Sequence, residues 1–418
     1  MNRRILRRFI STALSVMLIF SCLTLTAAAE ESTADKQTKE EVKAELDATA
    51  KAMCDYIKNK ISDEEAVLDS NDIKNYTLIL KSGYSDETVT DELLNFIKAM
   101  IDDKDNPISA TYEDRSGNVA LSNNYPYIIA FLNETGENSS DFNGYNFNSA
   151  LEEAYLDETV EVNPYLQQYV VSAVNFNKEA FKEPEKITEK AVNAVLDSYT
   201  TDESGNSGID YWGVSVDNNG QCLCVLKSLY DTDNDVKEKV DAAIAWSATQ
   251  FSDKGEIVSY GSPNPSSTAL AVKAFSENND LDNAAKAFGG MASFKSQDID
   301  GVYEAVIDYT TGAIGADYSY STPDALIGLL AYYRALNGID TLAVVNDTDT
   351  EEPSETTTVK PAETTGSLET TASASEVTTT DDKPQEVPPT GDVSRIFVVA
   401  AILLLSGTVY LGLNKKHA

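Results

Sequence analysis

Metal binding is the first chemistry that the sequence suggests, at an acidic string that contains Asp231, Asp233 and Asp235. Three carboxylates this close together could bind calcium, whose ligands are oxygen atoms. A calcium loop of the EF-hand type also needs glycine at its sixth position and glutamate at its twelfth. This chain has Val236 and Ala242 there. The alternative is a solvated helix N-terminus, where the helix dipole favours acidic side chains. We favour that alternative and expect no metal.

Nucleophilic and zinc chemistry have few candidate residues. The only histidine is His417, next to the C-terminal end, so we expect neither a His-based triad nor a His-ligated zinc in the domain. Cys54, Cys222 and Cys224 are too few for a disulfide framework, and we expect them to be small buried side chains. Glycosidase chemistry needs only two carboxyl groups. A carboxylate-dependent glycan-active enzyme therefore stays open, and we expect no cofactor.

Helical patterning dominates residues 30–345, the part that we expect to fold. Apolar residues recur at helical spacing in 43–61, 93–101, 166–176 and 187–196. Breaks rich in Asn, Asp, Ser and Gly separate these stretches. The pattern predicts a single, mostly helical domain.

A repeat is visible in the second half of this domain. Residues 221–229 align with 267–275, and 321–333 form a looser third copy. Each copy is apolar nearly all round, which predicts a buried helix. Residues 236–250, between the first two copies, carry an apolar stripe and a charged opposite face. The unit is an outer amphipathic helix, a loop and an inner apolar helix, and its repetition predicts stacked helical hairpins.

This repeat resembles that of α/α-toroid proteins, which include terpenoid cyclases, prenyltransferase β-subunits and transcobalamin-type binders. The segments that carry the resemblance are Trp246-Ser247-Ala248-Thr249-Gln250, Asp253-Lys254-Gly255-Glu256, 267–275 and Thr322-Pro323-Asp324-Ala325-Leu326. The resemblance covers roughly residues 70 to 340 and implies an all-α fold, an α/α toroid. It does not imply one activity, because a toroid hosts many functions. The acid motif of class II cyclases, Asp-any-Asp-Asp, is not matched at 231–235.

In a toroid of this kind, the loops before the inner helices form a mouth. Aromatic rings beside carboxyl and hydroxyl groups suit stacking on a sugar or on a corrin-like face. In the alternative, Trp212 and Trp246 belong to the core and the tyrosines are ordinary surface residues. The candidate ligand-binding residues are Tyr211, Trp212, Asp217, Tyr260, Tyr318 and Tyr320.

The C-terminal region 387–418 resembles a sortase cell-wall sorting signal. Its core is Val387-Pro388-Pro389-Thr390-Gly391, followed by an uncharged apolar stretch at 396–413 and then by a basic pair, Lys415-Lys416. The resemblance implies cleavage between Thr390 and Gly391 and covalent attachment to peptidoglycan. Val387 departs from the usual leucine, and a plain C-terminal transmembrane helix is the alternative.

Export and display complete the expected organisation. Residues 1–29 have a basic head, an apolar run and small residues before the expected cleavage site, which is typical of a signal peptide. Residues 346–386 are rich in Thr, Glu, Ser and Pro, which predicts a disordered linker. The net charge of −36 disfavours nucleic acid as a partner. We therefore expect a cell-surface-anchored, non-catalytic binding or adhesion protein. The alternatives are a protein that captures a cobamide or another small molecule, and a glycan-active enzyme.

Overall fold

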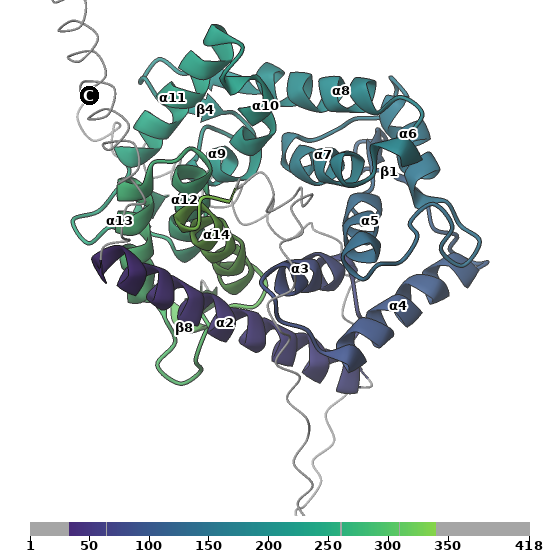
Figure 1. Cartoon of the computed structure of the whole chain (residues 1–418), viewed down its shortest axis with the longest axis horizontal. Coiled ribbons are helices and arrows are strands. Elements are labelled where there is room, and N and C mark those ends of the chain that lie inside the picture. Colours follow the sequence, from purple (N-terminus) through teal and green to yellow (C-terminus); the bar gives the residue numbers. More distant parts are fainter. Residues whose placement is uncertain (1–32, 64, 260, 309, 340–418) are drawn as a thin grey trace, which may run out of the picture. The chain divides into compact units, whose positions relative to one another are not determined.

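The computed structural model describes residues 33–339 except positions 64, 260 and 309. Within that part of the chain, the main helices alternate between an outer and an inner layer of a ring (Figure 1). The outer helices are α2 (Thr33–Ser62), α4 (Glu87–Asp102), α6 (Phe147–Leu156), α8 (Pro184–Asp197), α11 (Asn234–Ala248) and α13 (Leu281–Met291). The inner helices are α3 (Ser70–Lys81), α5 (Asn124–Glu134), α7 (Gln167–Phe176), α9 (Val216–Cys222), α12 (Pro265–Glu277) and α14 (Ser321–Leu336).

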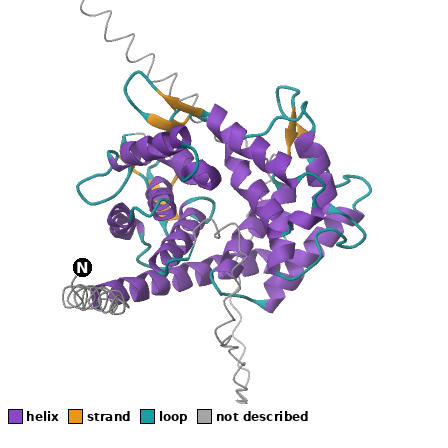
Figure 2. Ribbon diagram, turned by 45° about the horizontal axis from the view of Figure 1, so that its top comes forward, coloured by secondary structure: helices purple, strands orange, loops and turns teal. Residues whose placement is uncertain are grey.

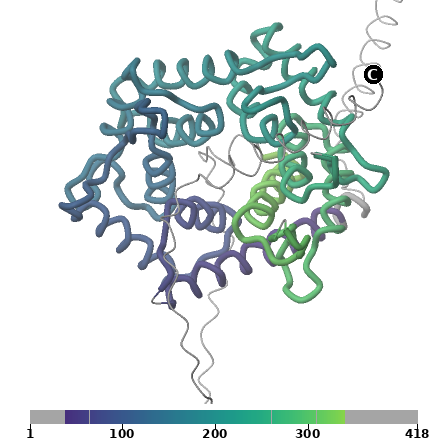
Figure 3. Tube along the Cα trace, turned by 180° about the vertical axis from the view of Figure 1, so that it is seen from behind, coloured from purple at the N-terminus to yellow at the C-terminus, as the bar shows by residue number. Residues whose placement is uncertain are grey.

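Contacts between neighbouring inner helices close the ring. Helix α3 packs on α5, α5 on α7, α7 on α9, α9 on α12 and α12 on α14, and α14 in turn contacts α3. The outer helix α2 contacts both α3 and α14, so the two ends of the described chain lie side by side (Figure 3). The toroid of helical hairpins that the repeat predicts is therefore confirmed as an arrangement of helices.

Close backbone approach explains why the inner helices are so completely buried. All but the first two residues of α12 are buried. A Cβ atom added at Gly328 of α14 would lie 2.4 Å from the carbonyl oxygen of Ala269 in α12. One added at Gly220 of α9 would lie 2.5 Å from the carbonyl oxygen of Leu270. Helices α14 and α9 therefore approach α12 so closely at these positions that only glycine fits.

The sequence predicted a single buried helix at 221–229, and the structure differs. Helix α9 gives way to a 3₁₀ turn, η3 (Leu223–Leu226), and a short helix, α10 (Lys227–Tyr230), follows. The predicted burial is confirmed for η3, in which every residue is buried, but no residue of α10 is buried. An apolar run indicates burial but does not distinguish the hydrogen-bonding pattern of a 3₁₀ turn from that of an α-helix. The other two copies lie within α12 and α14, as expected.

In the described part of the chain, β-hairpins stand in loops that lead from an outer helix into an inner helix (Figure 2). All are antiparallel: β1 (Thr111–Glu113) with β2 (Val119–Leu121), β3 (Tyr199–Thr201) with β4 (Ser207–Ile209), β5 (Val258–Ser259) with β6 (Ser262–Pro263), and β7 (Glu304–Asp308) with β8 (Ala313–Ala316). The all-α prediction is corrected to mostly helical, because strands this short show no usable alternation in the sequence. Successive hairpins make the inner helices parallel to one another. The β-hairpins therefore mark one rim of the ring, at the N-terminal ends of the inner helices, which we call the hairpin rim.

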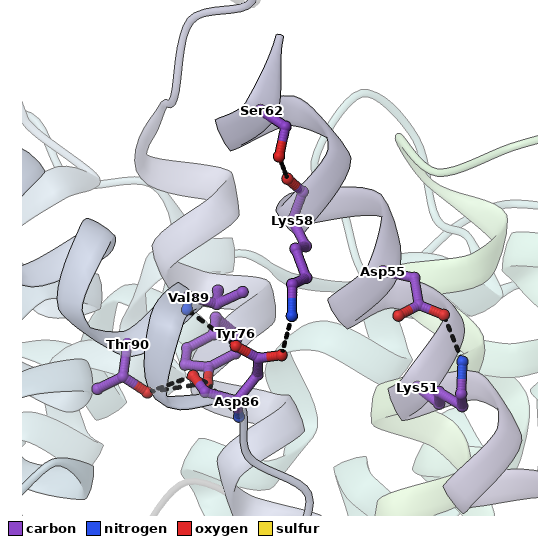
Figure 4. A network of polar contacts seen from close by, with 8 residues as sticks. All are labelled: Lys51, Asp55, Lys58, Ser62, Tyr76, Asp86, Val89 and Thr90. Atoms are coloured by element: carbon purple, nitrogen blue, oxygen red, sulfur yellow. Dashed lines mark hydrogen bonds and ion pairs between the residues drawn. The ribbon is translucent and has the colours of Figure 1, made fainter. Parts of the chain in front are cut away.

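A polar network fastens α2 to the turn between α3 and α4 (Figure 4). The Asp86 carboxylate accepts hydrogen bonds from the Val89 backbone N–H at 3.2 Å and from Lys58 Nζ at 2.6 Å. The Tyr76 hydroxyl donates to the Asp86 carbonyl oxygen at 2.7 Å. Partial burial would raise the pKa of the Asp86 carboxyl, but Lys58 and the backbone N–H groups outweigh it and hold that pKa below its usual value. The carboxylate thus caps α4 and binds α2 at the same time.

Several predicted segments lie outside the described residues. They are the signal peptide at 1–29, the linker at 346–386 and the region 387–418 with its sorting signal. Among the residues that the structure describes, no helix is long and apolar enough to cross a membrane.

Candidate functional site

Three aromatic rings meet on the hairpin rim, in the loops before α7 and α9. Tyr165 lies in the 3₁₀ turn η1 (Pro164–Leu166), and Tyr211 and Trp212 follow β4. The ring centroids of Tyr165 and Tyr211 are 5.1 Å apart, and those of Tyr211 and Trp212 are 6.0 Å apart, both edge to face. Trp212 is 83% exposed, so the alternative that placed it in the core is wrong. We call these three rings the aromatic shelf.

The buried side chain of Asn218 holds the shelf in place. Its Nδ2 lies 2.9, 3.0 and 2.7 Å from the carbonyl oxygens of Ile209, Tyr211 and Gly213. Its Oδ1 accepts a hydrogen bond from the Tyr165 hydroxyl. One amide therefore ties both loops of the shelf to the first turn of α9. The sequence reasoning missed Tyr165 and Asn218, because neither one carries a local signal for contacts made 53 residues apart.

The backbone at Trp212 is strained. Its φ is +65°, in the left-handed region that large side chains rarely adopt. Gly213 follows at φ +105°, and its N–H donates to the Asp210 carboxylate at 2.9 Å. Strain of this kind costs on the order of 1–3 kcal/mol and persists only where the surroundings enforce it. Here the Asn218 hydrogen bonds enforce a loop that presents an indole ring to solvent.

The other predicted site residues do not join the shelf. Asp217 lies half-buried in the first turn of α9, beside the loop that Asn218 holds. Tyr318 stacks instead on Tyr56 of α2, with ring centroids 4.4 Å apart, and Tyr320 precedes α14. Tyr260 lies outside the described residues. Helix α12 stands between α9 and α14 in the inner ring. The residues predicted to share one mouth are therefore divided into two groups, one before α9 and one before α14.

A fully buried ion pair lies in the wall of the ring. Lys273 and Glu277 are one turn apart on α12, with side chains 0% and 2% exposed, and Lys273 Nζ lies 2.8 Å from a Glu277 carboxylate oxygen. Nζ also donates to the carbonyl oxygen of Gly220 on α9 at 2.7 Å. The lysine thus links two inner helices. The predicted burial of the copy at 267–275 is confirmed and includes Lys273, whose charge is tolerated there because it is paired.

The thiols beside this ion pair are not reactive. Burial raises the pKa of Cys224 to about 11 and raises that of Cys222 as well. Both are therefore protonated at neutral pH, and a thiol is a poor nucleophile. The structure confirms the prediction that they are free, buried, small side chains.

Two carboxylates lie near one phenol of the inner wall. The pKa of Tyr169 on α7 is raised, first by burial and further by nearby charges that include Asp324 of α14 and Glu277 of α12. Asp324 accepts a hydrogen bond from Ser266 at 2.6 Å, and Glu277 pairs with Lys273. Both acids therefore already hold hydrogen-bond donors.

The calcium candidate is a helix cap. Asp233 precedes α11, and one of its carboxylate oxygens accepts the backbone N–H groups of Asp235 and Val236 at 2.9 and 3.2 Å. Asp231, Asp233 and Asp235 are all exposed. In the described part of the chain, no three His, Cys, Asp or Glu residues are grouped to hold a metal ion. The solvated helix N-terminus that we favoured is what the structure shows.

Comparison with known proteins gives distant structural likenesses. No family model and no curated protein matches the sequence. The type II terpene cyclase MstE from Scytonema, in complex with the product merosterolic acid A, has a TM-score of 0.44 and 11% identity over 71% of this chain and 99% of that one. Its complex with the substrate geranylgeranyl dihydroxybenzoate has a TM-score of 0.44 and 10% identity over the same shares. A protein from Actinoplanes has a TM-score of 0.40 and 11% identity over 63% of this chain and 89% of that one. We take no functional conclusion from likenesses this distant. The assignment of a ring of helices is based on the helix contacts described above.

Proposed function

We propose that this chain is a surface-displayed, non-catalytic binding protein whose aromatic shelf stacks on a sugar ring of an extracellular glycan. The observation that carries the proposal is the exposed indole of Trp212, on a backbone in the left-handed region and in a loop that the buried Asn218 side chain holds. A protein that only needed solubility would gain nothing from an exposed tryptophan in a costly backbone conformation.

The chemistry of the shelf favours a neutral or amine-bearing sugar. Aromatic faces stack on the apolar face of a sugar ring, and nearby hydroxyl and carboxyl groups bind its polar edge. Asp210 and Asp217 stand beside the shelf, and the whole chain has a net charge of −36. That charge repels uronic and sialic acids. A cobamide, whose corrin ring is also a broad flat face, is the other ligand to test.

Trp212→Gly separates a ligand-binding role of this residue from a structural one. We expect the variant to bind its glycan about 30-fold less tightly, as for the loss of a central aromatic contact. We also expect its free energy of unfolding to be about 1 kcal/mol higher than that of the wild type. Glycine avoids the cost of about 1–2 kcal/mol that other residues pay for a left-handed backbone conformation. Glycan-array and cobamide binding by residues 30–345, together with urea unfolding, measure both effects.

The matched control is Phe176→Ala, which removes an exposed aromatic side chain from the C-terminal end of the inner helix α7. Binding by this variant should equal that of the wild type. If Trp212→Gly binds glycans as well as the wild type does, the shelf is not the site. Binding of a cobamide alone would replace the glycan with the second ligand. Hydrolysis of a bound glycan would replace the binding role with the carboxylate-dependent enzyme.

We propose that the domain reaches its ligand from the cell surface, exported by residues 1–29 and carried on the linker at 346–386. Sortase and peptidoglycan are then its partners in anchoring, through Val387-Pro388-Pro389-Thr390-Gly391. Thr390→Ala should remove the covalently attached protein from wall fractions, because it removes the threonine side chain of the motif at which the resemblance places cleavage. Thr379→Ala, within the linker, should leave the attachment intact. Wall-bound protein in the Thr390→Ala cells would instead favour a plain membrane anchor.

A further inference from the structure

The hairpin of β7 and β8 exposes aliphatic side chains that the rest of the described fold does not cover. Ile307 is 60% exposed and Ile314 is 68% exposed. Val306, also exposed, is paired across the strands with Ile314. A bulge between Val306 and Asp308 places Ile307 outside the regular ladder. The hairpin thus carries an apolar surface on a small sheet whose position in the ring leaves it open to solvent.

The outer edge of β8 is unprotected. Its sequence, Ala-Ile-Gly-Ala, contains neither a charge nor a proline, the two devices by which proteins usually block an edge strand. Asp317 donates its N–H inward to the carbonyl oxygen of Tyr303 at 3.0 Å. Since N–H groups alternate in direction along an antiparallel strand, those of Ala316 and Ile314 point outward. No other strand of the described chain pairs with this edge.

Two other hairpins of the same rim are covered, which sets β8 apart. Glu161 bridges to β2, donating its N–H to Val119 at 2.8 Å and accepting one from Leu121 at 3.0 Å. In β4, the Ile209 N–H donates to the Asn219 side chain at 3.0 Å. The outer edge of β8 has no comparable strand or bridge partner among the described residues, so it can accept an added backbone.

The charge around the hairpin limits what can occupy that edge. Residues 296–317 contain five acidic residues and no basic one. A second copy of this chain would bring the same acidic hairpin and the same net charge of −36 against it. A basic segment would be attracted, and β-branched residues in it would pack on Val306 and Ile314.

We propose that the outer edge of β8 binds an extended, cationic peptide segment of a partner protein as an added strand. The backbone of the segment pairs with Ile314 and Ala316, its alternate aliphatic side chains cover Val306 and Ile314, and its basic side chains meet the acidic surroundings. This surface is independent of the aromatic shelf and of the proposed glycan ligand.

A nine-residue peptide of alternating lysine and valine is the probe, with binding to residues 30–345 measured by fluorescence anisotropy. Ile314→Lys should weaken binding at least about tenfold through lost packing and added repulsion. Ala316→Pro should weaken it similarly, because proline removes an outward N–H at a site where an edge strand tolerates it. Val67→Lys, which adds the same charge at another exposed apolar residue, should leave the affinity within about twofold.

A peptide with alternate backbone amides N-methylated keeps the charge and the side chains but cannot pair as a strand, and we expect it not to bind. Circular dichroism of each variant shows whether the ring remains folded. Equal binding of both peptides, or equal affinity of all three variants, would mean attraction by charge alone and would overturn the proposal. Absence of binding would overturn it too. Self-association in sedimentation that Ile314→Lys abolishes would assign the edge to a second copy instead.

Discussion

Replacing Lys273 with methionine should lower the free energy of unfolding by about 3–5 kcal/mol, the cost of breaking a buried ion pair. Methionine is similar in length to the aliphatic part of lysine, so little packing is lost. The variant leaves the Glu277 carboxylate buried without its ammonium partner and removes the bond to the Gly220 carbonyl oxygen. Chemical denaturation, followed by circular dichroism, measures the change.

The exposed counterpart of this pair is the control. Lys237 and Asp241 have the same one-turn spacing on α11, but their side chains are 44% and 52% exposed. Lys237→Met should change the free energy of unfolding by less than about 1 kcal/mol, as for other solvent-exposed pairs. The double variant Lys273→Met with Glu277→Leu should recover part of the loss, because no charge is then left buried. Equal effects of the two single variants would mean that burial of the Lys273 pair adds nothing to its strength.

The Lys273 contribution should also depend on pH. Burial alone would lower the pKa of this lysine, but the nearby Cys224 and Glu277 raise it above the ordinary 10.5. Because the folded-state pKa is the higher one, the stabilisation is complete below the unfolded-state pKa and is lost as the pH rises through the folded-state value. The difference in stability between the wild type and Lys273→Met should therefore be constant around neutral pH and shrink under alkaline conditions. A difference that grows at high pH would contradict the assigned direction.

Two adjacent glycines of α13 should respond to alanine in opposite directions. A Cβ atom at Gly290 would lie 2.2 Å from the carbonyl oxygen of Gly255, whereas one at Gly289 would meet nothing within 4 Å. Gly290→Ala should reduce the free energy of unfolding by about 1–3 kcal/mol, as overpacking against backbone does. Gly289→Ala should increase it by about 0.5–1 kcal/mol, because alanine is the better helix former at an exposed site.

The same unfolding experiment decides this comparison. The clash at Gly290 is with backbone atoms of the turn at Gly255, which has φ +86° and itself lies close to α13. Neither backbone can move aside as the end of a flexible side chain would. If both alanine variants are stabilised, α13 does not pack on this turn as closely as the structure has it.

The sequence by itself determined the elements whose signal is local. The apolar repeat at 267–275 and 321–333 predicted α12 and α14, and the stripe in 236–250 predicted the buried face of α11. Asp233 could be assigned to a helix N-terminus because capping involves neighbours only two and three residues away. The ring followed from repetition of one hairpin, since a unit that cannot bury its own apolar helix must pack on the next unit.

Only the tertiary structure decided which residues act together. Tyr211 and Trp212 were predicted from the sequence, but Tyr165 is brought to Tyr211 and Asn218 by the packing of α7 on α9. Tyr318 and Tyr320, assigned to the same mouth, belong to another part of the rim. Lys273 stands inside an apolar run, and nothing near it in the sequence shows that its ammonium group reaches Gly220 of another helix. Periodicity records which face of a helix is buried, whereas the identity of its neighbour depends on contacts between distant parts of the chain that a single sequence does not encode locally.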